Sequence, residues 1–365
     1  SPHIHPLKTK VKKPKTKGTK ADSVEKVTVA DLLPTLEKTD FKLDEQPYSS
    51  LFKIYQKEFL EISVSAGLIH ADSLALAGDG TPVVTSHRER KKRICNCKEN
   101  GIHDCNCDRY FSQPDCDIGW DSSRDCYYHG YDLYMLVDSQ SDLPVFPHFS
   151  CASKHDSHGF LHAFFRMKSF LPDYSVSKVL LDAAHDAMPY YQYFKRKNIT
   201  PFIDLNGKGG RPPVYKNDFT IDKDGVPICP SGFRMRRDGV EVAKGRMKFK
   251  CPKISHAGGC ISCTCENPCS NAKYGRTVHL VLKDNPRLFN NPPRSSKEWK
   301  LEYNARTSAE RSNKREKLDF KLEDGRHRST KMWYCRLYHI LMLQHLDAWD
   351  LPPESTLKKM ILDAA

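Results

Sequence analysis

The sequence predicts an α/β fold interrupted by a β-rich, cysteine-rich insertion. Between residues 74 and 203, apolar strand-like segments and amphipathic helical segments follow one another in the order strand, strand, strand, helix, strand, helix, strand. Residues 206–297 break this pattern with Gly/Pro-rich links and short alternating segments, which are typical of hairpins. Two helical patterns, over residues 303–317 and 329–349, then return to the first part of the fold.

The N-terminal residues divide into a basic arm and a helical segment. Residues 1–26 are rich in Lys and nearly free of large apolar groups, so we expect a flexible arm or linker. Within residues 27–70, apolar side chains recur at helical spacing, as in Leu51, Ile54 and Tyr55. This spacing predicts a helix leading into the main domain.

The first strand of the main domain, residues 74–84, carries Asp79 between two glycines. We expect Gly78 and Gly80 to leave space around the carboxylate. The alternative is that Asp79 and Gly80 form a hairpin turn. Asp72 is a competing carboxylate at this position.

Two further strands and a helix precede the second acidic position. Residues 130–137 and 143–150 are expected to pair antiparallel through a polar turn, and His155-Asp156-Ser157 to cap the helix that follows.

Within residues 177–186 we expect a buried strand with the carboxylate of Asp182 at its end. Asp186 competes with it, although we expect Asp186 to cap the helix over residues 187–197. We expect His185 to pack or hydrogen-bond locally rather than to touch DNA. A strand over residues 199–203 completes this series.

The composition favours a polyanionic partner. The 365 residues carry 58 Lys and Arg against 45 Asp and Glu, which gives a net charge of +13. No apolar run approaches the ~18 residues that a membrane span needs, and there is no signal-peptide core. The chain begins at Ser1 without Met, so an N-terminal module could be missing.

Ten of the fourteen cysteines fall in two clusters and are candidate structural zinc ligands. They are Cys95, Cys97, Cys105, Cys107, Cys229, Cys251, Cys260, Cys263, Cys265 and Cys269. In a large, Lys-rich chain without an export signal, metal binding or reduced thiols are expected rather than disulfides. Cysteines that bind nothing are the alternative left open.

One face of the helix over residues 303–317 concentrates polar chemistry. At about 100° per residue, Tyr303, Arg306, Glu310 and Lys317 fall within an arc of roughly 60°. A carboxylate flanked by cations suits a group that holds a divalent metal beside a phosphodiester. The alternative is a solvated helix face with ion pairs between neighbouring turns.

This spacing resembles the Y-x2-R-x3-E-x6-K signature of DDE transposases, the enzymes that cut and paste bacterial insertion sequences. The order of strands and helices is likewise that of an RNase H-like core, a five-stranded mixed sheet with flanking helices. In that fold the first and fourth strands lie side by side. The resemblance covers roughly residues 70–350, and many such transposases carry a β-rich insertion at the same point. The insertion in this sequence departs from the usual pattern, because it contains more cysteines.

The resemblance implies a catalytic site made of Asp79, Asp182 and Glu310. These carboxylates would bind two Mg²⁺ or Mn²⁺ ions about 3.5–4 Å apart for phosphodiester cleavage and strand transfer. DNA would be bound by the other three side chains of the signature, Tyr303, Arg306 and Lys317. The implied partner is double-stranded DNA, both transposon ends and target, held by a homodimer in the bacterial cytoplasm at the nucleoid, with no membrane association.

Together these expectations divide the chain into six segments. They are a basic arm (1–26), a helical segment (27–70), the first part of the catalytic domain (71–205, with a Cys-rich loop over 88–127), the insertion (206–297), the second part of the catalytic domain (298–350) and a tail (351–365). Two other functions remain open: a metal-dependent nuclease that does not join strands, and an inactive zinc- and DNA-binding derivative.

Overall fold

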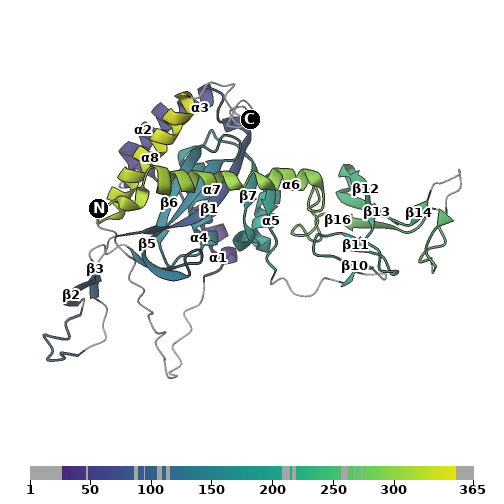
Figure 1. Cartoon of the computed structure of the whole chain (residues 1–365), viewed down its shortest axis with the longest axis horizontal. Coiled ribbons are helices and arrows are strands. Elements are labelled where there is room, and N and C mark those ends of the chain that lie inside the picture. The colour runs from purple at the N-terminus through teal and green to yellow at the C-terminus, as the bar shows by residue number, and fades with distance from the viewer. Residues whose placement is uncertain are drawn as a thin grey trace, which may run out of the picture.

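The computed structural model describes most of the chain between residues 27 and 350. The described ranges are 27–46, 48–85, 89–93, 95–104, 109–111, 116–207, 214–215, 219–255, 262–266, 268–272 and 274–350. The expected basic arm and C-terminal tail lie outside them. The described residues form an α/β part and a β-rich part, which lies to one side of it in Figure 1.

A mixed sheet forms the centre of the α/β part, with β1 (Leu74–Val84) in its middle. β5 (Cys126–Asp138) pairs antiparallel with one edge of β1, and β7 (Val176–Leu181) pairs parallel with the other. β8 (Thr200–Ile203) continues the sheet in parallel beyond β7. The first and fourth strands expected from the sequence therefore do lie side by side.

The far edge of β5 is shared by two strands. β6 (Pro144–Cys151) pairs with its second half, and β4 (Asp117–Asp121) pairs with its first half. The turn after Asp138 joins β5 to β6. The Asp138 carboxylate stabilises this turn by accepting hydrogen bonds from the backbone and the hydroxyl of Ser141. A separate short hairpin is formed by β2 (Glu89–Arg93) and β3 (Arg109–Phe111).

Two helices, α4 (Asp156–Phe170) and α5 (Met188–Arg196), cover one face of the sheet, and α1 (Val29–Lys38) packs against both of them. α4 begins where the sequence predicts, because the backbone N–H of Ser157 donates to the ring of His155. Its apolar side is buried against β1, β5 and β6. The apolar side chains that recur at helical spacing in the sequence are thus the ones that pack into the core.

On the other face lie α7 (Thr307–Lys314), which contacts β1 and β5, and α8 (Thr330–Asp350), which packs near β6. α2 (Ser49–Tyr55) continues through a π turn into α3 (Glu61–Ser65) and runs along α8. No helix within the described ranges is long and apolar enough to cross a lipid bilayer.

The helix expected over residues 303–317 is not regular. α6 (Lys297–Asn304) ends before Ala305, α7 begins at Thr307, and a π turn over Arg315–Asp319 follows it. Figure 1 shows α6 and α7 running on in nearly the same direction. The π turn shifts the side chains after residue 314 relative to a regular helix, so the simple 100° rule fails for Lys317.

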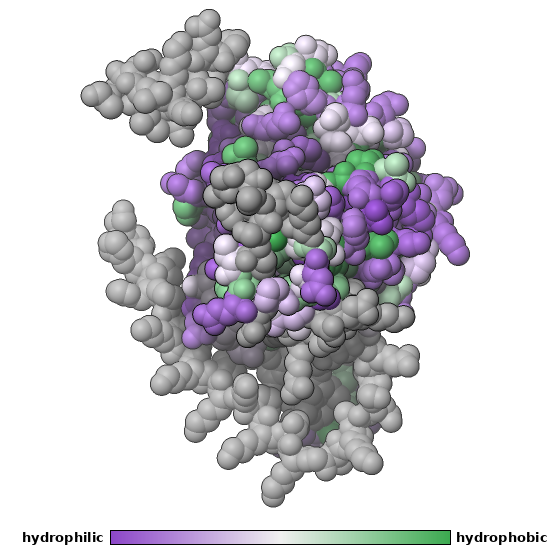
Figure 2. Space-filling model, turned by 90° about the vertical axis from the view of Figure 1, so that its right-hand side faces the viewer, coloured by the Kyte–Doolittle hydropathy of each residue, from purple (hydrophilic) through white to green (hydrophobic). Residues whose placement is uncertain are grey.

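The β-rich part contains short antiparallel sheets. One comprises β12 (Arg236–Glu241), β13 (Arg246–Lys250) and β16 (Thr277–Val281). The others comprise β9 (Val214–Tyr215), β10 (Phe219–Ile221) and β11 (Pro227–Ile228), and the pair β14 (Ile254–Ser255) and β15 (Ser262–Cys263). Residues such as Ile221, Met247 and Phe249 form a small core of their own. Figure 2 shows that this end of the molecule is largely hydrophilic outside, with scattered hydrophobic residues.

Candidate active site

Asp79 lies in the middle of β1. Pairing between β1 and β5 continues without a break from Leu76 to Val84, so the alternative of a hairpin turn at Asp79 is wrong. The side chain points toward α7, where Asn313 Nδ2 donates a hydrogen bond to Asp79 Oδ2 at 3.1 Å. Asn313 is 5% exposed, and no donor among the described residues reaches its Oδ1.

Asp182 directly follows β7 and lies level with Asp79. Ala77 is opposite Leu180 in the parallel pair, and two residues further along each strand come Asp79 and Asp182. Adjacent strands are about 4.8 Å apart, so the two acids are neighbours. Asp182 Oδ1 accepts from Ala184 N at 3.1 Å and lies 2.6 Å from His185 Nδ1.

His185 has the local hydrogen-bonding role that the sequence suggests. Its ring is 1% exposed, and its Nε2 lies 2.9 Å from the hydroxyl of Tyr134 on β5. The ring therefore connects the end of β7 to the neighbouring strands and fixes the orientation of Asp182.

Arg306 is the cation of the candidate site. Its Nη2 contacts Glu310 Oε1 at 2.6 Å, and its guanidinium lies 5.9 Å from the centre of the Tyr303 ring. The positive charge of Arg306 also acts on Asp79 and Asp182. The guanidinium of Arg306 thus contacts Glu310 directly, and its charge acts on the other two predicted acids. Glu310 is the most open of these groups, because its side chain is 50% exposed against 17% for Arg306.

The surroundings of the two aspartates shift their pKa values in opposite directions. Burial raises the pKa of Asp79 to about 7; Arg306 opposes this effect, whereas the nearby carboxylates of Asp182, Asp156 and Glu310 add to it. Burial would also raise the pKa of Asp182, but the hydrogen bond and the charge of His185 lower it below its ordinary value. Asp182 is therefore an anion at neutral pH, while Asp79 is divided between its neutral and charged forms.

The three acids fit hard divalent cations by donor chemistry, since Mg²⁺ and Mn²⁺ prefer carboxylate oxygens. The raised pKa of Asp79 shows that its charge is poorly compensated, which a cation would correct. In this conformation, however, no three Asp, Glu, His or Cys side chains in the described part of the chain are close enough to hold one metal ion. Arg306 supplies the positive charge between the acids instead.

Lys317 does not extend into solvent. Its Nζ donates to Pro82 O at 2.7 Å, lies 3.5 Å from Thr81 Oγ1 and pairs with Glu323 at 3.2 Å. The side chain is 13% exposed. Lys317 therefore attaches the π turn after α7 to the second half of β1, and contact with DNA phosphate would require it to leave these partners.

The competing acids are excluded by their positions. Asp72 is exposed in the turn before β1. Asp186 does not cap α5, as the sequence had suggested; the residue before α5, Ala187, has no side-chain cap. Asp186 instead forms an ion pair with Arg287, whose Nε and Nη2 donate to both of its oxygens. That ion pair joins the end of β7 to the chain that returns from the β-rich part, a long-range contact that sequence spacing does not show.

The cysteines lie in two parts of the chain. Cys229 and Cys251 are buried in the β-rich part, whereas Cys95, Cys97, Cys265 and Cys269 are half-buried. The predicted ligands Cys105, Cys107 and Cys260 lie outside the described residues, and only the backbone of Cys263 is described. Zinc binding at the two clusters stays a prediction.

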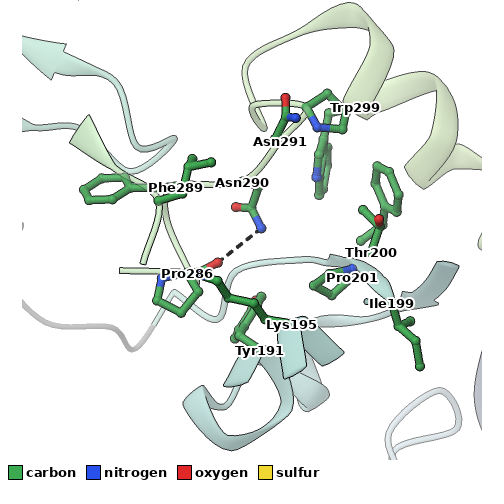
Figure 3. Close-up of a pocket in the computed structure, with 13 residues that line it drawn as sticks. Tyr191, Lys195, Ile199, Thr200, Pro201, Pro286, Phe289, Asn290, Asn291 and Trp299 are labelled. Atoms are coloured by element: carbon green, nitrogen blue, oxygen red, sulfur yellow. Dashed lines mark hydrogen bonds between the residues drawn. The ribbon is translucent and has the colours of Figure 1, made fainter. Parts of the chain in front are cut away.

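A cavity of about 170 Å³ lies between β8, α5 and the segment that returns from the β-rich part. Figure 3 shows Trp299 and Asn290 reaching toward it from one side, and Tyr191 and Lys195 from the other. The Trp299 and Tyr303 rings are stacked, with centres 4.8 Å apart. Because Tyr303 also contacts Arg306, the stack connects this cavity to the carboxylates.

Comparisons with known proteins give no independent assignment of the site. No protein-family model matches this sequence, and no curated protein matches it at a significant level.

Proposed function

We propose that this chain is a DNA transposase that cuts phosphodiester bonds and joins strands at Asp79, Asp182 and Glu310. The observation that carries the proposal is that these acids come from widely separated parts of the sequence, that Asp79 and Asp182 are level on neighbouring strands, and that the charge of Arg306 acts on all three. A solvated helix face would explain the pairing of Arg306 with Glu310, but not the two strand aspartates beside it.

The sheet supports an RNase H-like core as part of this proposal. When the short strands β2, β3 and β4 are left aside, the element order from β1 to β8 is strand, strand, strand, helix, strand, helix, strand, and the first and fourth of these strands, β1 and β7, are parallel neighbours. Asp79 lies on the first of these strands and Asp182 directly follows the fourth, while the helix that carries Glu310 packs on β1 and β5. The β-rich part lies in the sequence between Asp182 and Glu310, as in the transposases that the signature resembles.

The three acids would hold the Mg²⁺ or Mn²⁺ ions. When bound there, divalent ions supply charge stabilisation and an activated oxygen nucleophile for attack at phosphorus. Asn313 keeps Asp79 in place by donating to one of its oxygens. His185 likewise keeps Asp182 in place through the contact between its Nδ1 and Asp182 Oδ1. These two contacts fix the acids before DNA arrives, which lowers the cost of ordering the site.

Arg306 and Tyr303 would bind the DNA strand being cut. In the protein alone, the Arg306 guanidinium offsets part of the negative charge of the acids. In a complex with cations and DNA, it would be free to pair with a phosphate. The partner would be double-stranded DNA, both transposon ends and target, bound by a homodimer in the bacterial cytoplasm. Structural zinc in the cysteine clusters belongs to the same proposal.

A cleavage assay tests the function. Wild-type protein should nick supercoiled plasmid in Mn²⁺ but not in EDTA, whereas Asp79→Asn, Asp182→Asn and Glu310→Gln should lose at least about a hundredfold in rate. Asp173→Asn and Glu298→Gln are matched controls, because both residues are exposed outside the site. If the three site variants nicked DNA at the wild-type rate, the assignment would be wrong.

A second assay separates transposase from nuclease. Duplexes copied from the DNA that flanks the coding sequence, with free 3′-hydroxyl ends, are incubated with plasmid and Mn²⁺. A transposase gives covalently joined product, and a nuclease gives only nicks. A protein that binds DNA but yields neither product is the inactive derivative.

A further inference from the structure

Two aspartates converge on Gly80 from the face of β1 opposite to Asp79. Consecutive residues of a strand point to opposite faces. Asp79 points toward α7, so a side chain at Gly80 would point toward α4. A Cβ atom there would lie 2.7 Å from Asp156 Oδ1 and 3.4 Å from Asp132 Oδ1. Asp156 is the first residue of α4, and Asp132 lies on β5.

Asp132 is buried without a hydrogen-bond partner for one of its oxygens. The residue is 5% exposed, and no donor in the described part of the chain reaches Oδ2. Ser150 lies directly opposite on β6, and its Oγ is likewise buried and unpaired within those residues. Facing residues of an antiparallel pair project from the same face about 5 Å apart. Buried oxygens without partners are rare and indicate a missing water or ion.

The charges around this pair favour an ion over water. Burial raises the pKa of Asp132 well above its usual range, and the carboxylates of Asp156 and Asp79 raise it further. Burial also raises the pKa of Asp156; His185 and His155 oppose this effect, while Asp182 adds to it. A divalent cation between the two carboxylates would offset this repulsion and satisfy the unpaired oxygens.

We propose that Asp132 and Asp156 bind a divalent cation of the Mg²⁺ and Mn²⁺ class on the α4 side of β1. The Ser150 hydroxyl provides a further oxygen on the same face. Mg²⁺ is commonly held by one or two carboxylates and keeps several of its waters, so a third acid is not needed. The β1 backbone separates this site from Asp79 and Glu310, and the proposal does not rest on the proposed function.

Counting bound Mn²⁺ by electron paramagnetic resonance tests the proposal. The full chain, freed of metal with EDTA, is titrated with Mn²⁺ alongside Asp132→Asn, Asp156→Asn and Gly80→Ala. Each variant should lose one bound Mn²⁺ per chain or bind it at least about tenfold more weakly. Gly80→Ala is the sharpest of the three, because it changes no charge and places a methyl group 2.7 Å from Asp156 Oδ1.

Asp138→Asn is the matched control. Asp138 is 2% exposed on the same strand, but its carboxylate already accepts from the backbone and hydroxyl of Ser141. This variant should bind Mn²⁺ as the wild type does. Asp79→Asn should keep the ion as well, whatever its effect on DNA cleavage.

Two results would overturn the proposal. If Asp132→Asn, Asp156→Asn and Gly80→Ala all bound Mn²⁺ with wild-type stoichiometry and affinity, the carboxylates would share a proton rather than hold a cation. If Asp79→Asn abolished all binding, the ion would belong to the predicted catalytic site. Near-ultraviolet circular dichroism shows whether each variant folds. If the variants at the buried positions do not fold, the Mn²⁺ stoichiometry of Asp156→Asn alone tests the proposal, because Asp156 is only half-buried.

Discussion

Replacing Asp79 with Asn should stabilise the metal-free protein at high pH. The pKa of Asp79 is raised from 3.8 in the unfolded chain to about 7 in the folded protein. Between these values the folded protein binds more protons than the unfolded chain. The stability contributed by this group is therefore complete at low pH and is lost as the pH rises through about 7.

The size of the effect follows from the shift. A change in pKa from 3.8 to about 7 corresponds to about 4 kcal/mol when the carboxyl group is fully ionised. About 2.5 kcal/mol of this loss falls between pH 5 and pH 8. Asn resembles the neutral carboxyl group and does not ionise. The difference in unfolding free energy between Asp79→Asn and wild type should thus increase by about that amount over the same interval.

Urea unfolding in EDTA at pH 5 and pH 8 measures this difference. Asp173→Asn is the control, because Asp173 is exposed in a loop and its replacement should give no such trend. A difference that stayed constant, or that favoured wild type at pH 8, would refute the statement that Asp79 is buried with too little positive charge beside it.

Three further predictions concern the helix that carries Glu310. Asn313→Ala removes the donor to Asp79, so the pKa of Asp79 should rise by about 1–2 units, measurable by carboxyl NMR titration; an unchanged value would exclude the positioning role. Lys317→Met should lower the unfolding free energy by about 1–3 kcal/mol, since its ammonium is bound internally; a loss confined to DNA affinity and its salt dependence would instead support phosphate contact. Burial raises the pKa of Glu316 to about 8, so Glu316→Gln should gain stability relative to wild type between pH 6 and pH 9 in urea unfolding; a constant difference would contradict this.

The sequence predicts those parts of the fold in which local pattern and packing agree. β1, β5 and β6 are largely apolar runs that are buried almost continuously, and α4 repeats its buried apolar residues at helical spacing. Asp79 and Asp182 could be placed on neighbouring strands because the order of elements resembles that of the RNase H-like fold, in which the first and fourth strands lie side by side. Asn313 was missed, although its position three residues after Glu310 places it on an adjacent part of the same helix face.

Other features depend on contacts that no local pattern encodes. The partner of Asp186 is Arg287, about a hundred residues away, so a helix cap was the nearest local explanation. The environment of Lys317 depends on a π turn, which ordinary helix spacing does not include. The convergence of Asp132 and Asp156 requires the register of β5 against β1, together with the absence of a side chain at Gly80.

Anomalous diffraction from a crystal of the protein with DNA and Mn²⁺ tests most directly whether Asp79, Asp182 and Glu310 hold the metal. We predict a Mn²⁺ peak within about 2.5 Å of oxygens from both Asp79 and Asp182, with Glu310 turned toward it and Arg306 moved onto a phosphate. A complex with bound DNA and saturating Mn²⁺, but with no peak at either aspartate, would contradict the account.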